Sequence, residues 1–116
     1  MTAFSRPATA ADIAQYFEGI PTPTMRAWVL ERDGELLGIG GLSYRAGDPK
    51  LFMDWQPEAE KYPIALYKAA RGFLASIDNG NLYAYACSSK ACKLLTRLGL
   101  KHLASLPDQE VFVWQP

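Results

Sequence analysis

Residues 54–74 join an expected strand to an expected helix, and such a junction can bind a phosphate. The first N–H groups of a helix have no partner within the helix, and the helix dipole is positive there. A glycine-rich turn lets an anion reach these amides, but no glycine lies between Gly47 and Gly72. Pro63 supplies no N–H, and Glu60 adds a negative charge. The segment therefore predicts a phosphate site that has lost much of its capacity.

Two lysines flank the same junction. Lys61 and Lys68 are near enough in sequence to reach the start of the helix and to offset part of the charge of Glu60. At about 4 Å and a surface-like dielectric, repulsion between Glu60 and a phosphate charge is on the order of 4 kcal/mol before salt screening. That energy corresponds to roughly a thousandfold loss of affinity. The alternative is that both lysines are solvated surface residues.

Two cysteines and a single histidine could carry nucleophilic, redox or metal chemistry. Cys87 and Cys92 fall in an expected strand and the helix after it, without the further ligands that a zinc site needs. A reactive thiol needs an activating partner, and nothing in the sequence links either thiol to His102. We therefore expect buried thiols, no metal site, and a histidine that is exposed or partly buried.

Capping residues, and apolar residues that recur every three or four positions, predict the helices. Asp12 follows Thr9 at the spacing of a capping box, so a short helix begins there. Apolar residues recur at helical spacing over residues 63–77. A third helix is expected to be capped by Ser88 or Ser89 and to end before Gly99.

The remaining segments predict strands. A first short strand is expected in "FSRPA", a hairpin over residues 25–45 turning at Asp33-Gly34, a third meander strand in "KLFMDW", and two strands around Pro107-Asp108. "LYAYACS" is apolar on both alternating faces, which predicts an interior strand covered on two sides, and most strand aromatics are assigned to the core. Strand, helix and strand from residue 50 to 88 imply one parallel pair in a mostly antiparallel sheet.

The glycines of the hairpin invite comparison with nucleotide-binding loops. Gly38, Gly40 and Gly41 follow a hairpin turn and do not open a helix, so the context of the dinucleotide fingerprint is missing. We expect a bulge or close strand packing at these positions.

Length and composition limit the classes of protein. With 116 residues, 49% of them hydrophobic and 21% charged, the chain is expected to fold as one domain over residues 1–116. Its formal net charge of zero gives no global attraction to nucleic acid or to an anionic membrane. No stretch is long enough to span a membrane, and the N-terminus lacks the signal-peptide pattern, so a cytoplasmic location is expected.

The element order, with "DGELLGIGGL" in the hairpin and "ACKLLTRLGL" before the last strands, resembles the GNAT superfamily of acyl-CoA-dependent N-acyltransferases. The resemblance covers nearly the whole chain, and both motifs are structural. It implies an α+β, three-layer domain. The implied sheet is mixed and mostly antiparallel, with one parallel pair at its centre and helices on both faces.

Active GNAT members bind the CoA pyrophosphate with an Arg/Gln-x-x-Gly-x-Gly/Ala loop before the central helix. Laid on this sequence from Pro57 and Glu58, the pattern places Glu60 at the Arg/Gln, Pro63 at the first glycine and Ala65 at the last position, so only Ala65 fits. The cofactor-binding residues implied by the resemblance are Trp55, Lys61, Ile64, Ala65 and Ser88, the last at the position of a family asparagine.

The resemblance also implies catalytic positions. Active members commonly place a glutamate near the fourth strand as general base and a tyrosine in the late helix as general acid. The tyrosine position falls on Leu95. Asp54 and Glu58 lie close enough to the expected site to serve as base, directly or through water. The alternative is that each is a turn or cap residue.

These departures favour a GNAT-fold protein with a degenerate acyl-CoA loop and no cofactor. The resemblance to phage and prophage GNAT-like chains implies a non-catalytic or atypical accessory protein, virion-associated or cytoplasmic, that binds a phage or host protein. The alternative is an active acetyl-CoA-dependent N-acetyltransferase with a small amine acceptor. A third reading is a regulatory domain that binds CoA without chemistry. No nucleic-acid or membrane partner is expected, and a dimer through free sheet edges is permitted.

Overall fold

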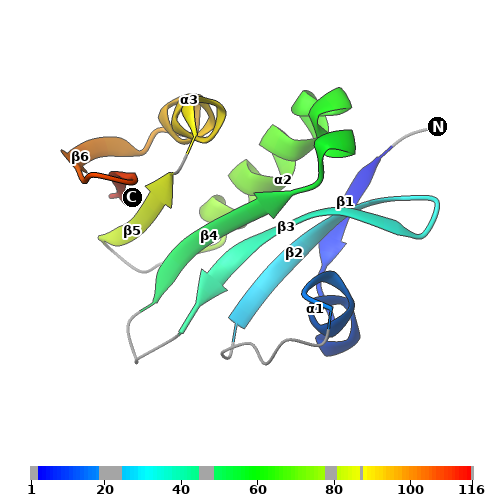
Figure 1. Cartoon of the computed structure of the whole chain (residues 1–116). Helices are drawn as coiled ribbons and strands as arrows, with labels where there is room; N and C mark the ends of the chain where they lie inside the picture. Colours follow the sequence, from blue (N-terminus) through cyan, green and yellow to red (C-terminus); the bar gives the residue numbers. More distant parts are fainter. Residues whose placement is uncertain (1–2, 19–24, 45–48, 78–80, 87, 116) are drawn as a thin grey trace.

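A computed structural model describes residues 3–18, 25–44, 49–77, 81–86 and 88–115. These residues form a mixed seven-stranded sheet in the order β1-β2-β3-β4-β5-β7-β6 (Figure 1). The strands are β1 (Phe4–Pro7), β2 (Met25–Arg32), β3 (Glu35–Ser43), β4 (Lys50–Trp55), β5 (Leu82–Ala86), β6 (Lys101–Ser105) and β7 (Glu110–Trp114). The helices are α1 (Ala10–Tyr16), the 3-10 turn η2 (Pro57–Lys61), α2 (Pro63–Ala75) and α3 (Ser89–Arg97).

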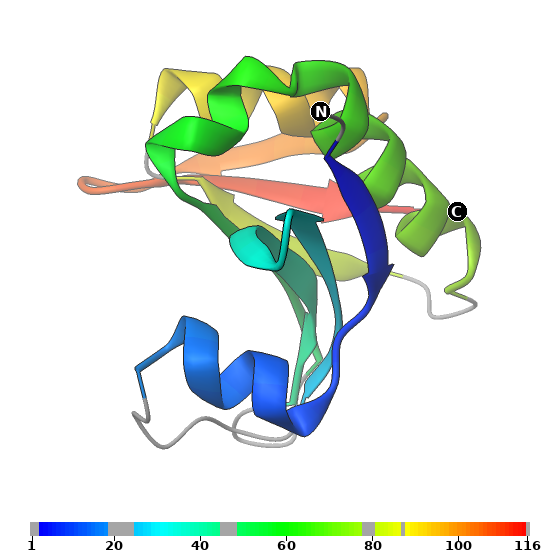
Figure 2. The ribbon, with the colours of Figure 1, turned by 90° about the vertical axis from the view of Figure 1, so that its right-hand side faces the viewer.

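Helices cover both faces of the sheet. On one face Ile13 and other residues of α1 pack on Val29 and Ile39. On the other face α2 and α3 pack on Trp28, Leu30 and neighbouring strand residues (Figure 2). Leu30 is fully buried, and burying such a side chain contributes about 1.5–3 kcal/mol. The predicted three-layer α+β fold, with its single parallel pair between β4 and β5, is confirmed.

Local signals placed several element ends correctly. Asp33 and Gly34 both have positive φ, 52° and 81°, which the tight β2–β3 turn requires. Ser88 caps α3 by accepting a hydrogen bond from the amide of Ala91. Gly99, with φ 97°, follows the last residue of that helix. α2 ends two residues earlier than the periodicity predicts, because the buried Ile77 belongs to the connection that follows it.

The strand β5 lies inside the sheet, but the prediction that both its faces are covered is wrong. Leu82, Ala84 and Ala86 are buried against the helices, whereas Tyr83 and Tyr85 on the other face are 41% and 42% exposed. The helix α1 covers the part of that face that β2, β3 and β4 form. Tyrosine tolerates this position because its ring packs on neighbours while its hydroxyl meets water.

An ionic cluster joins β1, α1 and β2. The carboxylate of Asp12, which is 8% exposed, accepts two hydrogen bonds from the guanidinium of Arg6, at 2.7 and 3.0 Å. It also accepts from the amide of Thr9, completing the expected capping box, and Arg6 reaches Glu31 at 3.0 Å. Arg6 foremost, then the Thr9 amide, hold the pKa of the Asp12 carboxyl well below its usual range.

Replacement of Asp12 should make stability less dependent on acid. Asp12→Asn is expected to lower the free energy of unfolding by about 2 kcal/mol at pH 7, because Arg6 loses its ionised partner. A depressed carboxyl pKa contributes stability above the unfolded pKa near about 4, and the contribution is lost as pH falls below that value. Urea unfolding at pH 7 and pH 3 should therefore show the two proteins converging in acid. Asp33→Asn, in the exposed turn, is the control, and parallel pH curves for Asp12→Asn would contradict the argument.

None of the helices in the described ranges combines the length and apolar character needed to cross a membrane.

Candidate functional site

The two central strands separate soon after they pair. Among the described residues, β4 and β5 are joined by the pairs Lys50↔Tyr83 and Leu51↔Ala84 alone. Beyond Leu51, β4 keeps its pairing with β3 on one side and has no strand partner on the other. Because the strands are parallel, η2 after β4 and α3 after β5 begin on opposite sides of this gap, which we call the β4–β5 opening (Figure 1).

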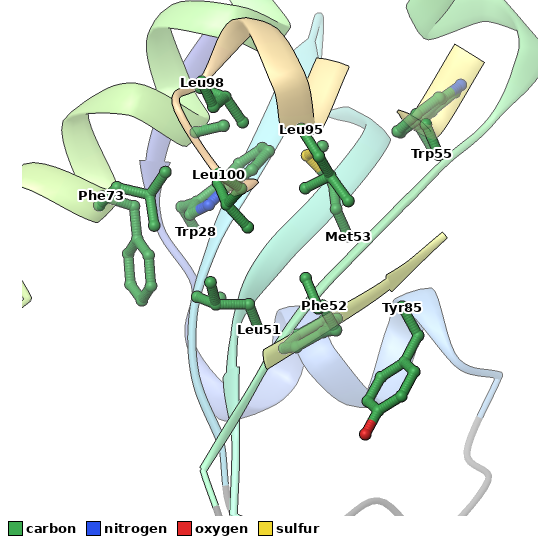
Figure 3. A pocket seen from close by; sticks show the side chains of 15 residues that line it. Trp28, Leu51, Phe52, Met53, Trp55, Phe73, Tyr85, Leu95, Leu98 and Leu100 are labelled. Carbon is green, nitrogen blue, oxygen red and sulfur yellow. The ribbon is translucent and has the colours of Figure 1, made fainter. Parts of the chain in front are cut away.

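An apolar cavity lies behind the β4–β5 opening (Figure 3). Its volume is about 60 Å³, roughly four to six water-sized spaces. It is lined by Trp28, Gly41, Leu51, Phe52, Met53, Trp55, Ala70, Phe73, Leu74, Ala84, Tyr85, Ala91, Leu95, Leu98 and Leu100. The cavity can therefore hold the end of a ligand, while the rest of a large ligand would lie outside.

The start of α2 retains two amides for an anion. Pro63 is its first residue, and no side chain caps this end. The amide of Leu66 donates to Tyr62 at 3.0 Å, and that of Tyr62 to Ala59 at 2.9 Å. Within the described ranges the amides of Ile64 and Ala65 have no hydrogen-bond partner. Ile64 is 70% exposed, and Ile64 and Ala65 both line an open groove at this end of α2.

An ion pair spans the β4–β5 opening. The carboxylate of Glu60 in η2 contacts the ammonium of Lys90 in the first turn of α3. Lys61 and Lys68 were expected to offset the charge of Glu60, but Lys61 pairs with Glu58, at 3.0 Å. The repulsion between Glu60 and a diphosphate is therefore smaller than a lone carboxylate would cause. Lys90 could have been found from the parallel pairing, which places both helix starts at the same edge.

The candidate base Glu58 is engaged in two ion pairs. Its carboxylate contacts Lys61 and, at 3.3 Å, the guanidinium of Arg32. Lys61 foremost, then Arg32, lower the pKa of Glu58 below its ordinary value. A general base works best with a pKa near the operating pH, so these partners make Glu58 a weaker base.

The second candidate, Asp54, lies on the opposite side of β4 from the cavity. Met53 and Trp55 pack toward α2, whereas Asp54 accepts a hydrogen bond from the hydroxyl of Tyr16 in α1, at 3.0 Å. Burial foremost, then Asp54, raises the pKa of Tyr16. The sequence argument did not single out Tyr16, although its place on the sheet-facing side of α1 was a usable signal.

An open groove with several carboxylates lies on the α1 side, and we call it the acidic groove. Its lining residues are Gln15, Tyr16, Glu18, Glu35, Leu36, Gln56, Pro57 and Glu58. Two of the carboxylates, Glu35 and Glu58, share Arg32 as a partner. The third carboxylate, that of Glu18, has no ion-pair partner within the described residues, so it is the one that could meet a cation. The groove lies on the other face of the sheet from the cavity.

Cys92 and His102 form no metal site with other described residues. Cys92 is half-buried and free, while Cys87 lies outside the described residues. His102 is exposed and contacts Glu110 at 3.3 Å. In the part of the chain that the structure describes, no group of three His, Cys, Asp or Glu side chains could hold a metal ion.

No family model matches the sequence, and no curated protein is significantly similar to it. Solved structures do match. The ribosomal-protein-S18-alanine N-acetyltransferase from Escherichia coli superposes with a TM-score of 0.66 at 10% identity, over 97% of this chain and 91% of that one. A GNAT-family acetyltransferase from Bacillus cereus ATCC 10987 gives 0.66 at 11% identity, over 99% and 98%. The AtaTR complex bound with acetyl-CoA gives 0.55 at 13% identity, over 97% and 92%.

The chain has the GNAT fold. Identities this low establish the shared architecture alone. Within it, Leu95, which the sequence resemblance aligns with the family's tyrosine, lines the cavity with an apolar side chain, and so does Trp55. Ser88, which the resemblance aligns with a family asparagine, is exposed, and its hydroxyl already accepts from the amide of Ala91 at 3.1 Å. The structure thus brings Trp55 and Leu95 together in the cavity and places Lys61, Ile64, Ala65 and Ser88 at the two helix starts.

Proposed function

We propose that this GNAT-fold protein is a binding protein that holds the acyl end of an acyl-CoA in the β4–β5 opening and does not transfer the acyl group. The observation that carries the proposal is the start of α2, where Pro63 leaves the amides of Ile64 and Ala65 as the free donors. Two amides next to Glu60 support a weak hold on a diphosphate. The open β4 edge and the cavity support an acyl end that still fits.

Two residues support the proposal that the protein does not transfer the acyl group. The pKa of Glu58 is lowered by its ion pairs, and the side chain of Leu95 offers no proton. Transfer from a thioester to an amine needs a group that removes a proton from the amine and one that protonates the leaving thiolate. The role as accessory protein to a phage or host partner is a further part of this proposal, and it rests on the sequence resemblance.

A melting experiment with a transfer assay tests the proposal. If 1 mM acetyl-CoA is near its dissociation constant, it stabilises the fold by about 0.4 kcal/mol, a shift of about 2 °C in a domain of this size. We expect such a small shift and no release of free CoA with amine acceptors. A shift of about 10 °C is expected when the ligand concentration is a hundred times the dissociation constant. Such a shift would contradict the proposal that acetyl-CoA binds weakly. No shift at all would overturn binding.

A second candidate function is acyl transfer with Asp54 as the general base. It is favoured by the 3.0 Å hydrogen bond between Tyr16 and Asp54 and by the adjoining acidic groove, which suits a cationic amine. Release of CoA that Asp54→Asn abolishes, with acetyl-CoA binding unchanged, would establish this candidate against the first.

A further inference from the structure

Two tyrosines stand on the part of the sheet that α1 leaves uncovered. Tyr83 and Tyr85 alternate with the buried residues of β5, so both rings lie on the face away from α2 and α3. Both side chains are exposed, and α1 lies away from β5 (Figure 1). Two positions along a strand place the rings roughly 7 Å apart. The rings therefore offer a flat, partly apolar surface to a ligand.

The pairing of the strands puts a lysine at each end of one row across this face. Lys50 of β4 pairs with Tyr83. Tyr83 pairs with Val113 of β7, and Val113 pairs with Lys101 of β6. Paired residues point to the same face of a sheet, so the row carries two positive charges. Three strand spacings separate the ends of the row by about 14 Å.

Both lysines are free to meet an anion. Lys50 and Lys101 are exposed, and neither forms an ion pair within the described residues. The ammonium of Lys50 lies 5.8 Å from the centre of the Tyr85 ring, and this cation–π contact holds the charge beside the ring. Glu110, the one carboxylate of β5, β6 and β7, lies on the opposite face. Asp54, four residues beyond Lys50 on β4, already accepts a hydrogen bond from α1.

The combination of rings and charges narrows the class of ligand. A simple anion would use the lysines and leave the exposed rings unused, whereas an apolar partner would use the rings and leave the charges unpaired. A single strand of nucleic acid offers both bases that stack on aromatic rings and phosphates that contact lysines. In a duplex the bases are stacked on one another, so a duplex offers its phosphates without free base faces.

We propose that the uncovered face of β4, β5, β7 and β6 binds single-stranded nucleic acid. Two neighbouring bases stack on Tyr83 and Tyr85, and the flanking phosphates contact Lys50 and Lys101. The formal charge of zero predicts no global attraction to nucleic acid, but this row is a local feature that net charge does not describe. The site is independent of the proposed function, because α2 and its start lie on the other face of the sheet (Figure 2).

Fluorescence anisotropy with labelled oligonucleotides tests the proposal. The probes are a dT dodecamer, a U dodecamer and a dA·dT duplex of the same length, each titrated with the full chain at several salt concentrations. Two phosphate contacts should give a slope of about −1.4 in a plot of log affinity against log salt. We expect the duplex to bind at least about tenfold more weakly than the single strands. The ratio of the U and dT affinities shows whether RNA or DNA is preferred.

Matched variants separate stacking from charge. Tyr83→Leu and Tyr85→Leu keep apolar bulk on β5 and remove the rings, so each should weaken single-strand binding about tenfold without changing the salt slope. Lys50→Ala should make the slope shallower by about 0.7. Phe4→Leu and Lys68→Ala alter an exposed ring and an exposed lysine elsewhere on the protein, so they should change neither quantity.

The tyrosine ring signals report stacking directly. In protein with 13C-labelled tyrosine rings, the dT dodecamer should move the Tyr83 and Tyr85 signals upfield, and each signal is assigned by its loss in the leucine variant. Equal binding of duplex and single strand, unchanged affinity in both tyrosine variants, or no binding at low salt would overturn the proposal. A dimer in sedimentation that Tyr83→Leu dissociates would overturn it too, because a second copy would then cover this face.

Discussion

The double variant Glu60→Gln, Pro63→Gly is expected to bind acetyl-CoA about a hundredfold more tightly than the unaltered protein. Glycine at residue 63 returns the missing N–H to the start of α2, and a charge-assisted hydrogen bond of this kind is worth roughly tenfold or more in affinity. Glutamine at residue 60 removes the like charge and frees Lys90, its present partner, for the diphosphate. Isothermal titration calorimetry of the single and double variants measures both parts.

Matched variants show whether the gain has this cause. Glu18→Gln removes an exposed carboxylate that lines the acidic groove and has no ion-pair partner within the described residues, so affinity should stay unchanged. Lys90→Ala, added to Glu60→Gln, should cancel most of the gain from the glutamine. Equal affinity in the double variant and the unaltered protein would show that the start of α2 does not receive a diphosphate, and the weak-hold proposal would fall with it.

The variant Gly41→Ala is expected to lose at least about 3 kcal/mol of stability, a large share of what a domain of this size has. A Cβ at residue 41 would lie 2.1 Å from the carbonyl oxygen of Arg26 and 2.7 Å from the Cα of Ala27 on the adjacent strand. Both atoms are backbone, so neither can swing aside, and φ is 153°. Urea unfolding monitored by circular dichroism measures the loss.

Gly72→Ala is the control for the glycine argument. Nothing lies within 4 Å of a Cβ at that helical position, so alanine should stabilise α2 by up to about 1 kcal/mol. A loss below about 1 kcal/mol in Gly41→Ala would mean that β2 and β3 can separate locally, contrary to the close strand packing described for this glycine.

Much of the fold could be predicted because its signals are local. The Thr9 and Asp12 cap, the Asp33-Gly34 turn and the Ser88 cap each depend on residues a few positions apart, and each is present. The parallel pair followed from the order strand, helix, strand. The expected close strand packing of the hairpin glycines is also found, since Gly40 lies under the ring of Trp28.

The rest depends on contacts between distant residues. Glu60 meets Lys90 thirty positions away, and Tyr16 meets Asp54 thirty-eight away. No spacing rule gives such pairs before the sheet order is known. The exposed face of β5 was missed for a related reason. The apolar ring of Tyr83 fits the alternation expected of a buried strand, but the ring is buried only if a helix covers that part of the sheet, and α1 does not extend over it.

Within the described residues, two residue pairs between β4 and β5 connect the two halves of this sheet. A ligand chain bound along the open edge of β4 would make hydrogen bonds that β5 does not make there. The free energy of ligand binding would therefore also hold the two halves of the sheet together. The protein without ligand would then open between β4 and β5 more often than the protein with ligand bound. Its rate of proteolysis would therefore report the concentration of ligand around it.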